Sequence, residues 1–454
     1  MTMNNNFFNT ERKVFALIFI IYFLSSLIQF NFNSELRIDS VGLHLPRALT
    51  GDEPHYLIAI NSFMKDFDFD VKNNYDSVAI NQSLEGGVNF RNNLNGALNE
   101  RRNRYVLNKT ILDRQIRDPL TTRIKPEFLE FIKLNEKNMS FITTIPPGLP
   151  VLFGLFLFPL RNTQYVEFTI ILTTMLLSVL GLSFFYKTLL HFSENKKRSL
   201  FFTFLYAFAT PLWFYSKTIY TEPYATALLT MMFYFVVVRK NTLLAGFIGG
   251  LMFVIKYPFL IFSVPFAAYI LFYKKRKISS LLKFSSGYCL FIFAQMAYNY
   301  TLFGNIFETG RTDAIVNTLE GLFGILFSPS YGLLFFSPIL IFCIFGFKGF
   351  FKAHKKELFL ILGITLPFYL LMASFSWEGG SYSNRYILPI IFTLIIPLQF
   401  WYNSTKNLLA KNAFNLLIYL SAFVNVQAAL FSALAMGKTP WIAVHYLLKI
   451  FHLG

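Results

Sequence analysis

The chain is dominated by uncharged apolar stretches that approach the length needed to cross a membrane. A helix spans the hydrocarbon core with about 20 apolar residues. Only 14% of the 454 residues are charged, against roughly 25% in a soluble domain. The sequence therefore predicts an all-α polytopic membrane protein with about eleven transmembrane helices. The predicted spans are Val14–Phe30, Phe168–Tyr186, Ser199–Ser216, Pro223–Val238, Thr242–Ile255, Tyr257–Tyr273, Phe284–Phe303, Tyr331–Phe347, Leu358–Phe375, Tyr386–Tyr402 and Ala413–Met436.

The net charge of +17 is interpreted as an orientation signal and not as a nucleic-acid signature. The polar segment from Asn31 to Pro147 contains fifteen basic and fifteen acidic residues, so it adds nothing to the net charge. The rest of the chain has 26 basic and 9 acidic residues. With Arg12 and Lys13 in the cytoplasm, alternating spans place nineteen basic residues inside and seven outside, as the positive-inside rule predicts. We therefore expect no nucleic-acid partner.

This orientation places the long polar segment on the extracytoplasmic side, provided that Leu149–Leu160 does not cross. We expect that short run to lie at the outer surface or to dip into it. The first span has no small-residue cleavage site, so we expect a retained anchor. The expected modules are a cytoplasmic tail with the first helix (1–30), a large outer loop with juxtamembrane helices (31–164), a transmembrane module (165–303), a second outer loop (304–330), the C-terminal transmembrane helices (331–436) and an outer tail (437–454).

Two adjacent acids in the long polar segment form the sharpest candidate for a reactive site. Asp52 and Glu53 precede Pro54 and an amphipathic stretch. One interpretation is helix capping, because aspartate accepts backbone N–H bonds and proline suits a first helical turn. Capping requires one acid, whereas here two stand beside His55 and Tyr56. The other interpretation is a carboxylate held near the membrane surface as a general base.

Glu222, in a predicted outer connector, also has two interpretations. It precedes Pro223 and so fits a capped helix start. It also fits a second carboxylate at the level of Asp52, since carboxylates from different loops can divide base and orienting roles.

Three predicted outer cations complement these acids. Lys256 interrupts apolar sequence, and Arg311 and Arg385 each close a segment that contains glycine. Glycine lets backbone N–H groups approach a ligand, and arginine can donate two parallel bonds to phosphate. Each cation alone can be explained by contact with an outer-leaflet lipid headgroup or by an ion pair with a nearby glutamate. The three together predict a site that binds an anion. The additional pocket candidates are His55, Tyr56, Trp377, Glu378, Tyr382 and Tyr386.

A metal site is not supported by any motif. Asp66, Asp68 and Asp70 alternate as at the start of a calcium loop. Val71 and Ser77 stand where such a loop requires glycine and glutamate. The favoured interpretation is a solvated turn, and we expect no required cofactor, although a divalent metal stays possible.

With these residues in place, the sequence resembles the GT-C superfamily of membrane glycosyltransferases, in particular protein O-mannosyltransferases and bacterial aminoarabinose transferases. The likeness includes the anchor, the first outer loop with Asp52, the segment Pro146–Pro150 and the acid Glu222. Two later segments, which end at or near Arg311 and Arg385, look like segments of bacterial members. Relatives often have aspartate where this chain has Glu222.

The resemblance implies a GT-C-like fold and a sugar donor linked to polyprenyl phosphate, often with no essential metal. The acceptor would be an extracytoplasmic lipid, glycan or protein, and the transfer would invert the anomeric centre. Asp52 would be the catalytic base, with Glu53 as its neighbour. The residues expected to bind the donor phosphate are Lys256, Arg311 and Arg385. A composition rich in Phe, Asn and Lys is typical of an AT-rich bacterial genome, which places the protein in an inner membrane among lipids.

The alternative function is a membrane transporter or flippase of a lipid-linked or anionic substrate. Lys256 and the outer acids would then line a substrate path. The sequence shows no inverted repeat, and its only large polar segment follows the first span. Both features favour the enzyme.

Overall fold

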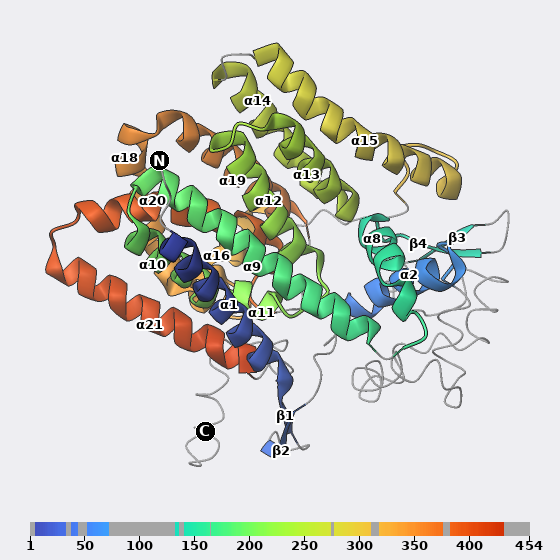
Figure 1. Cartoon of the computed structure of the whole chain (residues 1–454), viewed down its shortest axis with the longest axis horizontal. Helices are drawn as coiled ribbons and strands as arrows, with labels where there is room; N and C mark the ends of the chain where they lie inside the picture. Colours follow the sequence, from blue (N-terminus) through green and yellow to red (C-terminus); the bar gives the residue numbers. More distant parts are fainter. Residues whose placement is uncertain are drawn as a thin grey trace.

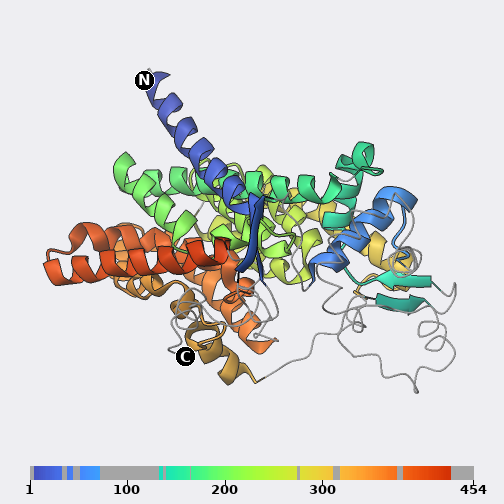
Figure 2. The same cartoon turned by 90° about the horizontal axis from the view of Figure 1, so that it is seen from below.

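The structure is a computed structural model that describes residues 5–32, 38–43, 52–71, 132–135, 140–163, 165–273, 277–309, 317–375 and 382–430. These residues form an elongated helical bundle, with a smaller group of short elements at one end (Figures 1 and 2). The predicted spans coincide with helices over most of their length. The long uninterrupted helices are α1 (Asn5–Leu27), α9 (Val166–Ser193), α12 (Thr221–Val237), α13 (Thr242–Ile255), α15 (Lys277–Phe303), α19 (Lys355–Ser374) and α21 (Leu408–Leu430).

Within the described part of the chain, four helical segments are long and apolar enough to cross a membrane. They are Val166–Ser193, Lys355–Ser374, Arg385–Ser404 and Leu408–Leu430. Further apolar helical segments of 10–17 residues are Thr242–Ile255, Tyr257–Tyr273 and Thr318–Phe327. The chain is therefore an integral membrane protein, while the total of eleven spans stays a prediction.

Prolines divide several of the predicted spans into shorter pieces, because a proline removes a backbone donor from the helix. Pro211 separates α10 from α11, and Pro258 opens a 3₁₀ helix, η2, ahead of α14. The divided spans are α10 (Lys196–Phe208) with α11 (Leu212–Tyr215), η2 (Tyr257–Phe262) with α14 (Ser263–Tyr273), α17 (Leu333–Phe336) with η3 (Pro338–Phe342) and α18 (Cys343–Ala353), and η4 (Arg385–Ile390) with α20 (Ile391–Ser404).

The described part of the first outer loop contains two short helices that pack on each other, α2 (Glu53–Asp66) and α8 (Gly148–Phe156). A 3₁₀ turn, η1 (Phe158–Leu160), follows α8. Nine helical residues extend about 14 Å, less than half of the ~30 Å hydrocarbon core. The run Leu149–Leu160 is thus too short to cross as one helix.

The expectation of an all-α chain is wrong at the edges of this loop. Strand β1 (Ile28–Phe32) pairs antiparallel with β2 (Ile38–Leu43), and β3 (Ile132–Asn135) pairs with β4 (Ser140–Thr143). The first predicted span therefore ends as a helix at Leu27. The residues of β1 alternate apolar and polar, which is the period of a strand and not of a helix.

The expected outer loop 304–330 contains a helix that length alone does not reveal, α16 (Thr318–Phe327). The side chain of Asn317 accepts the N–H of Leu319 at 3.2 Å and caps it. A Cβ at Gly321 would lie 2.0 Å from the carbonyl oxygen of Ala373 in α19. This close approach holds α16 against the bundle.

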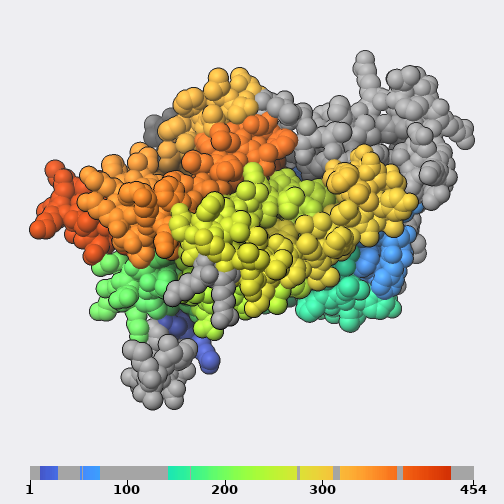
Figure 3. All heavy atoms as spheres, turned by 90° about the horizontal axis from the view of Figure 1, so that it is seen from above, coloured from blue at the N-terminus to red at the C-terminus, as the bar shows by residue number. Residues whose placement is uncertain are grey.

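Helices α13 and α15 pack with their backbones unusually close together. A Cβ at Gly246 would lie 1.9 Å from the carbonyl oxygen of Phe284, and one at Gly287 would lie 2.6 Å from that of Leu243. Only glycine permits this contact. Figure 3 shows α15 along one face of the molecule, beside α2 and α8.

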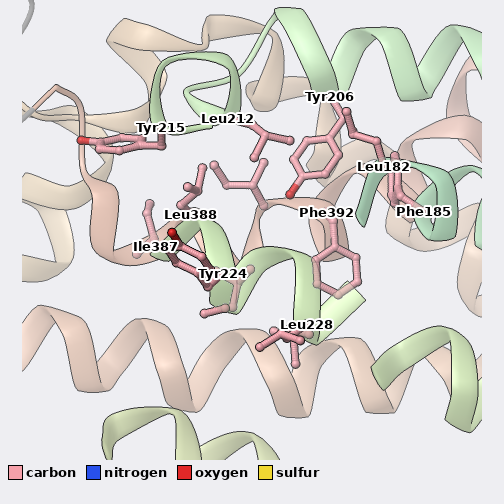
Figure 4. Packing of buried hydrophobic residues seen from close by; sticks show 14 of the residues in the cluster. Leu182, Phe185, Tyr206, Leu212, Tyr215, Tyr224, Leu228, Ile387, Leu388 and Phe392 are labelled. Carbon is pink, nitrogen blue, oxygen red and sulfur yellow. The ribbon is translucent and has the colours of Figure 1, made fainter. Parts of the chain in front are cut away.

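The buried core is continuous and rich in aromatic side chains. Figure 4 shows Phe185 of α9, Tyr206 of α10 and Phe392 of α20 within it. The ring centre of Phe185 lies 4.9 Å from that of Tyr206 and 6.4 Å from that of Phe392. Ile387 and Leu388 of η4 are buried in the same core. The 3₁₀ helix that begins at Arg385 is therefore fixed by packing.

Candidate active site

The carboxylate of Asp52 forms an ion pair and does not cap the helix that it precedes. The backbone carbonyl of Asp52 accepts the N–H groups of His55 at 3.0 Å and Tyr56 at 3.2 Å, which starts α2, while the side chain makes no capping bond. Asp52 Oδ2 instead accepts a hydrogen bond from a terminal nitrogen of Arg385 at 2.5 Å, across 333 residues of sequence. Of the two interpretations, the structure rejects side-chain capping.

Arg385 is enclosed by tyrosine rings. Its side chain is 4% exposed. The guanidinium carbon lies 4.2 Å from the ring centre of Tyr220 and 5.0 Å from that of Tyr386, whose hydroxyl accepts a hydrogen bond from the same terminal nitrogen at 3.2 Å. Aromatic faces attract a guanidinium, so the two rings hold Arg385 in place.

A second ion pair lies beside the first. Glu222 stands in the first turn of α12, and Lys256 lies between α13 and η2. Lys256 Nζ is 2.6 Å from Glu222 Oε1, and their side chains are 16% and 2% exposed. A carboxylate in a first turn is stabilised by the helix dipole. Glu222 lies at a helix start, but that helix begins after Tyr220 without a side-chain capping bond; its ion pair with Lys256 places it beside Arg385, and its role in a reaction stays a prediction.

Tyr386 joins the two pairs. Lys256 Nζ lies 5.0 Å from the centre of the Tyr386 ring, the same separation as the Arg385 guanidinium. Four predicted site residues from distant parts of the sequence thus form one cluster of two carboxylates and two cations. Asp52 is its most accessible charged side chain, at 25% exposure. A partly exposed carboxylate near a buried guanidinium and a half-buried ammonium can accept a proton beside a bound anion.

Glu53 has a different role from its neighbour. It is fully buried, and its Oε1 accepts the backbone N–H of Ile219 at 2.7 Å. Ile219 belongs to the connector that carries Tyr220 and leads into α12, where Glu222 lies in the first turn. Glu53 therefore ties the start of α2 to the connector and is turned away from solvent.

The histidine and tyrosine that follow lie at the start of α2. His55 and Tyr56 are buried. Burial lowers the pKa of His55 to about 4, while the nearby charge of Asp52 opposes this shift. His55 is consequently neutral at physiological pH.

Tyr382 lies in the core and not with the ion pairs. Its ring packs on Phe214 and Phe336 with centres 4.8 and 4.7 Å away. Its hydroxyl donates to Asn425 Oδ1 in α21 at 3.2 Å, and its carbonyl accepts the hydroxyl of Tyr215. Arg311, Trp377 and Glu378 lie outside the described residues.

One residue of the site was not among the sequence candidates. Tyr220 packs on Arg385. Lys217, earlier in the same connector, is buried elsewhere and donates to backbone oxygens near the ends of two helices, those of Ser25 at 3.4 Å and of Ala429. The sequence contains both residues shortly before Glu222, but only the fold shows which of them contacts the ion pairs.

The aspartates after α2 form a local turn. Asp68 Oδ1 accepts from Ser62 Oγ at 2.9 Å and from the backbone N–H of Asp70 at 3.2 Å. Within the described ranges, no group of three His, Cys, Asp or Glu side chains has a spacing suited to a metal ion.

Comparison with known proteins supports the fold. No family model and no curated protein matches the sequence. Among solved structures, the chain is similar to ArnT from Cupriavidus metallidurans in the apo state, an aminoarabinose transferase. The similarity has a TM-score of 0.56 at 11% identity, and it covers 99% of this chain and 71% of ArnT. The chain therefore has an ArnT-like fold. The clustered charges within this fold form the candidate active site.

Proposed function

We propose that the protein is a membrane glycosyltransferase that moves a hexosyl or pentosyl group from a polyprenyl-phosphate donor to an extracytoplasmic acceptor. The observation that carries the proposal is the Asp52–Arg385 pair, a partly exposed carboxylate beside an enclosed guanidinium, in a chain with the fold of a sugar transferase. Acceptor activation needs a base, and departure of the lipid phosphate needs a fixed cation at the same place.

In the proposed reaction, Asp52 takes the proton of the acceptor hydroxyl or amine as that atom attacks the anomeric carbon. The new bond forms on the face opposite the lipid phosphate, so the configuration inverts. The bond from the anomeric carbon to the phosphate oxygen breaks through a transition state that resembles an oxocarbenium ion, and its electron pair leaves on the phosphate. Arg385 and Lys256 stabilise that growing charge. Asp52 then returns its proton to solvent.

The proposal includes the orientation in the membrane. With about eleven spans and Arg12 in the cytoplasm, the module 31–164 and the site face the extracytoplasmic side of a bacterial inner membrane. Arg311, Trp377 and Glu378 would belong to the same pocket. The acceptor is a lipid, a glycan or a protein, and no metal is assigned to the reaction.

A radiolabelled polyprenyl-phosphate sugar, supplied to the full chain in proteoliposomes, tests the proposal. We expect covalent transfer of the label to an acceptor from the cell envelope. Mass spectrometry of envelope glycolipids, with and without the protein, identifies a lipid product. Passage of the intact donor across the bilayer without bond cleavage would support a flippase and contradict the proposal.

A further inference from the structure

The proposed base and the proposed phosphate ligand are bound to each other. Asp52 Oδ2 accepts from a terminal nitrogen of Arg385 at 2.5 Å, and that nitrogen also donates to Tyr386. In this arrangement the carboxylate is neutralised by its cation, and the guanidinium edge that would receive an anion is covered.

The two partners differ in how easily each could leave the contact. Arg385 is 4% exposed and is packed between Tyr220 and Tyr386. Asp52 is 25% exposed and stands ahead of the first turn of α2. A carboxylate with access to water can be rehydrated when it moves, whereas an enclosed charge cannot. Asp52 is therefore the mobile partner.

The neighbouring pair has the opposite asymmetry. Its carboxylate, Glu222, is the enclosed partner at 2% exposure, in the first turn of α12, whereas Lys256 is 16% exposed. Release of Glu222 from Lys256 would leave a charge without water, so in this pair the carboxylate stays in place.

Arg385 also has unused binding capacity. Its Nε is buried and makes no hydrogen bond among the described residues. A buried donor without an acceptor is costly. A phosphate offers several oxygens in the spacing of the guanidinium fork, so it can satisfy Nε and replace Asp52 on the terminal nitrogen.

We propose that the donor phosphate displaces Asp52 from Arg385, so that the catalytic base is released only in the donor-loaded enzyme. This inference rests on the proposed function and adds an order, in which the donor binds before the acceptor is activated. A carboxylate that loses its cation becomes a stronger base. Because the phosphate takes the position that Asp52 leaves, the freed carboxylate stays close to the anomeric carbon attached to that phosphate.

Binding of sugar-free polyprenyl phosphate to the full chain in nanodiscs tests this competition without any transfer step. Asp52→Asn removes the competing charge, so we expect affinity to rise by about two- to fivefold, which corresponds to the free energy of a partly exposed ion pair. Asp66→Asn is the matched control: it makes the same chemical change on the same helix, about 20 Å away, and should leave affinity unchanged. Asp52→Ser carries the same expectation if the asparagine variant does not fold.

The outcomes separate the two proposals. Tighter binding by the Asp52 variants supports the exchange. Affinity that is unchanged or reduced in these variants, with normal binding by the wild type, overturns the exchange but leaves the proposed function standing. No binding of polyprenyl phosphate by the wild type overturns both.

Discussion

Glu53 Oε1 accepts the backbone N–H of Ile219 at 2.7 Å, and this bond connects positions 166 residues apart. It ties the residue after Asp52 to the connector that carries Tyr220 and leads to Glu222 in the first turn of α12. The distance between the two halves of the site therefore depends on a buried side chain that the structure places away from solvent.

Glu53→Ala should weaken both stability and turnover. A buried acceptor bond of this kind is worth about 1–3 kcal/mol, so we expect a lower unfolding temperature and a lower kcat. Glu53→Gln keeps an amide oxygen for Ile219 and should recover most of kcat. If Glu53 were instead the reacting base, the glutamine variant would be as inactive as the alanine variant. Differential scanning fluorimetry and initial rates make the distinction.

The Glu222–Lys256 pair should show strong coupling. Lys256→Met leaves Glu222 enclosed without its cation, and we expect a loss of ~3 kcal/mol in stability. Adding Glu222→Gln to that variant should restore at least half of the loss, because no uncompensated charge remains. Thermal unfolding of the two single variants and the double variant measures the coupling. Purely additive losses would show that the pair is not a structural unit.

Stability should fall in acid through His55. Burial lowers the pKa of His55 to about 4 from an unfolded value of about 6.5. The unfolded chain therefore binds a proton that the folded chain does not, so this stability is present above pH 6.5 and is lost as the pH falls toward 4. The loss from pH 7 to pH 5 is about 2 kcal/mol. His55→Gln should flatten the unfolding temperature over that interval, and parallel curves for the two proteins would contradict the assignment.

Gly246→Ala should separate α13 from α15. The added Cβ would lie 1.9 Å from the carbonyl oxygen of Phe284, and we expect a cost of about 1–3 kcal/mol. Gly349→Ala is the control, since its Cβ would meet nothing nearer than Phe400 Cβ at 3.3 Å. Equal unfolding temperatures for the two variants would mean that the contact is not tight.

The sequence predicted which charged residues lie on the same side of the membrane. Asp52, Glu222, Lys256 and Arg385 each interrupt or flank an apolar run, and alternation of those runs places them on the same side. The sequence could not predict which acid pairs with which cation, because the Asp52–Arg385 contact spans 333 residues and depends on how the helices pack.

The local sequence pattern also could not predict where individual side chains point. Tyr382 and Tyr386 are four residues apart, yet the first packs on Phe336 in the core and the second joins the two cations. The intervening residues are not one regular helix, since η4 begins only at Arg385. Strand β1, by contrast, could have been predicted locally. Its residues alternate apolar and polar, which indicates a strand, although they lie within the run that was predicted to be the first transmembrane helix.

The central claim is tested most directly by the rate at which the Asp52→Asn protein transfers sugar from a polyprenyl-phosphate donor. Loss of a general base lowers turnover about 10²- to 10⁴-fold, so we expect a drop in that range with the protein still folded in membranes. The Asp66→Asn protein should retain normal turnover under the same conditions. Wild-type turnover in the Asp52→Asn protein would contradict the account.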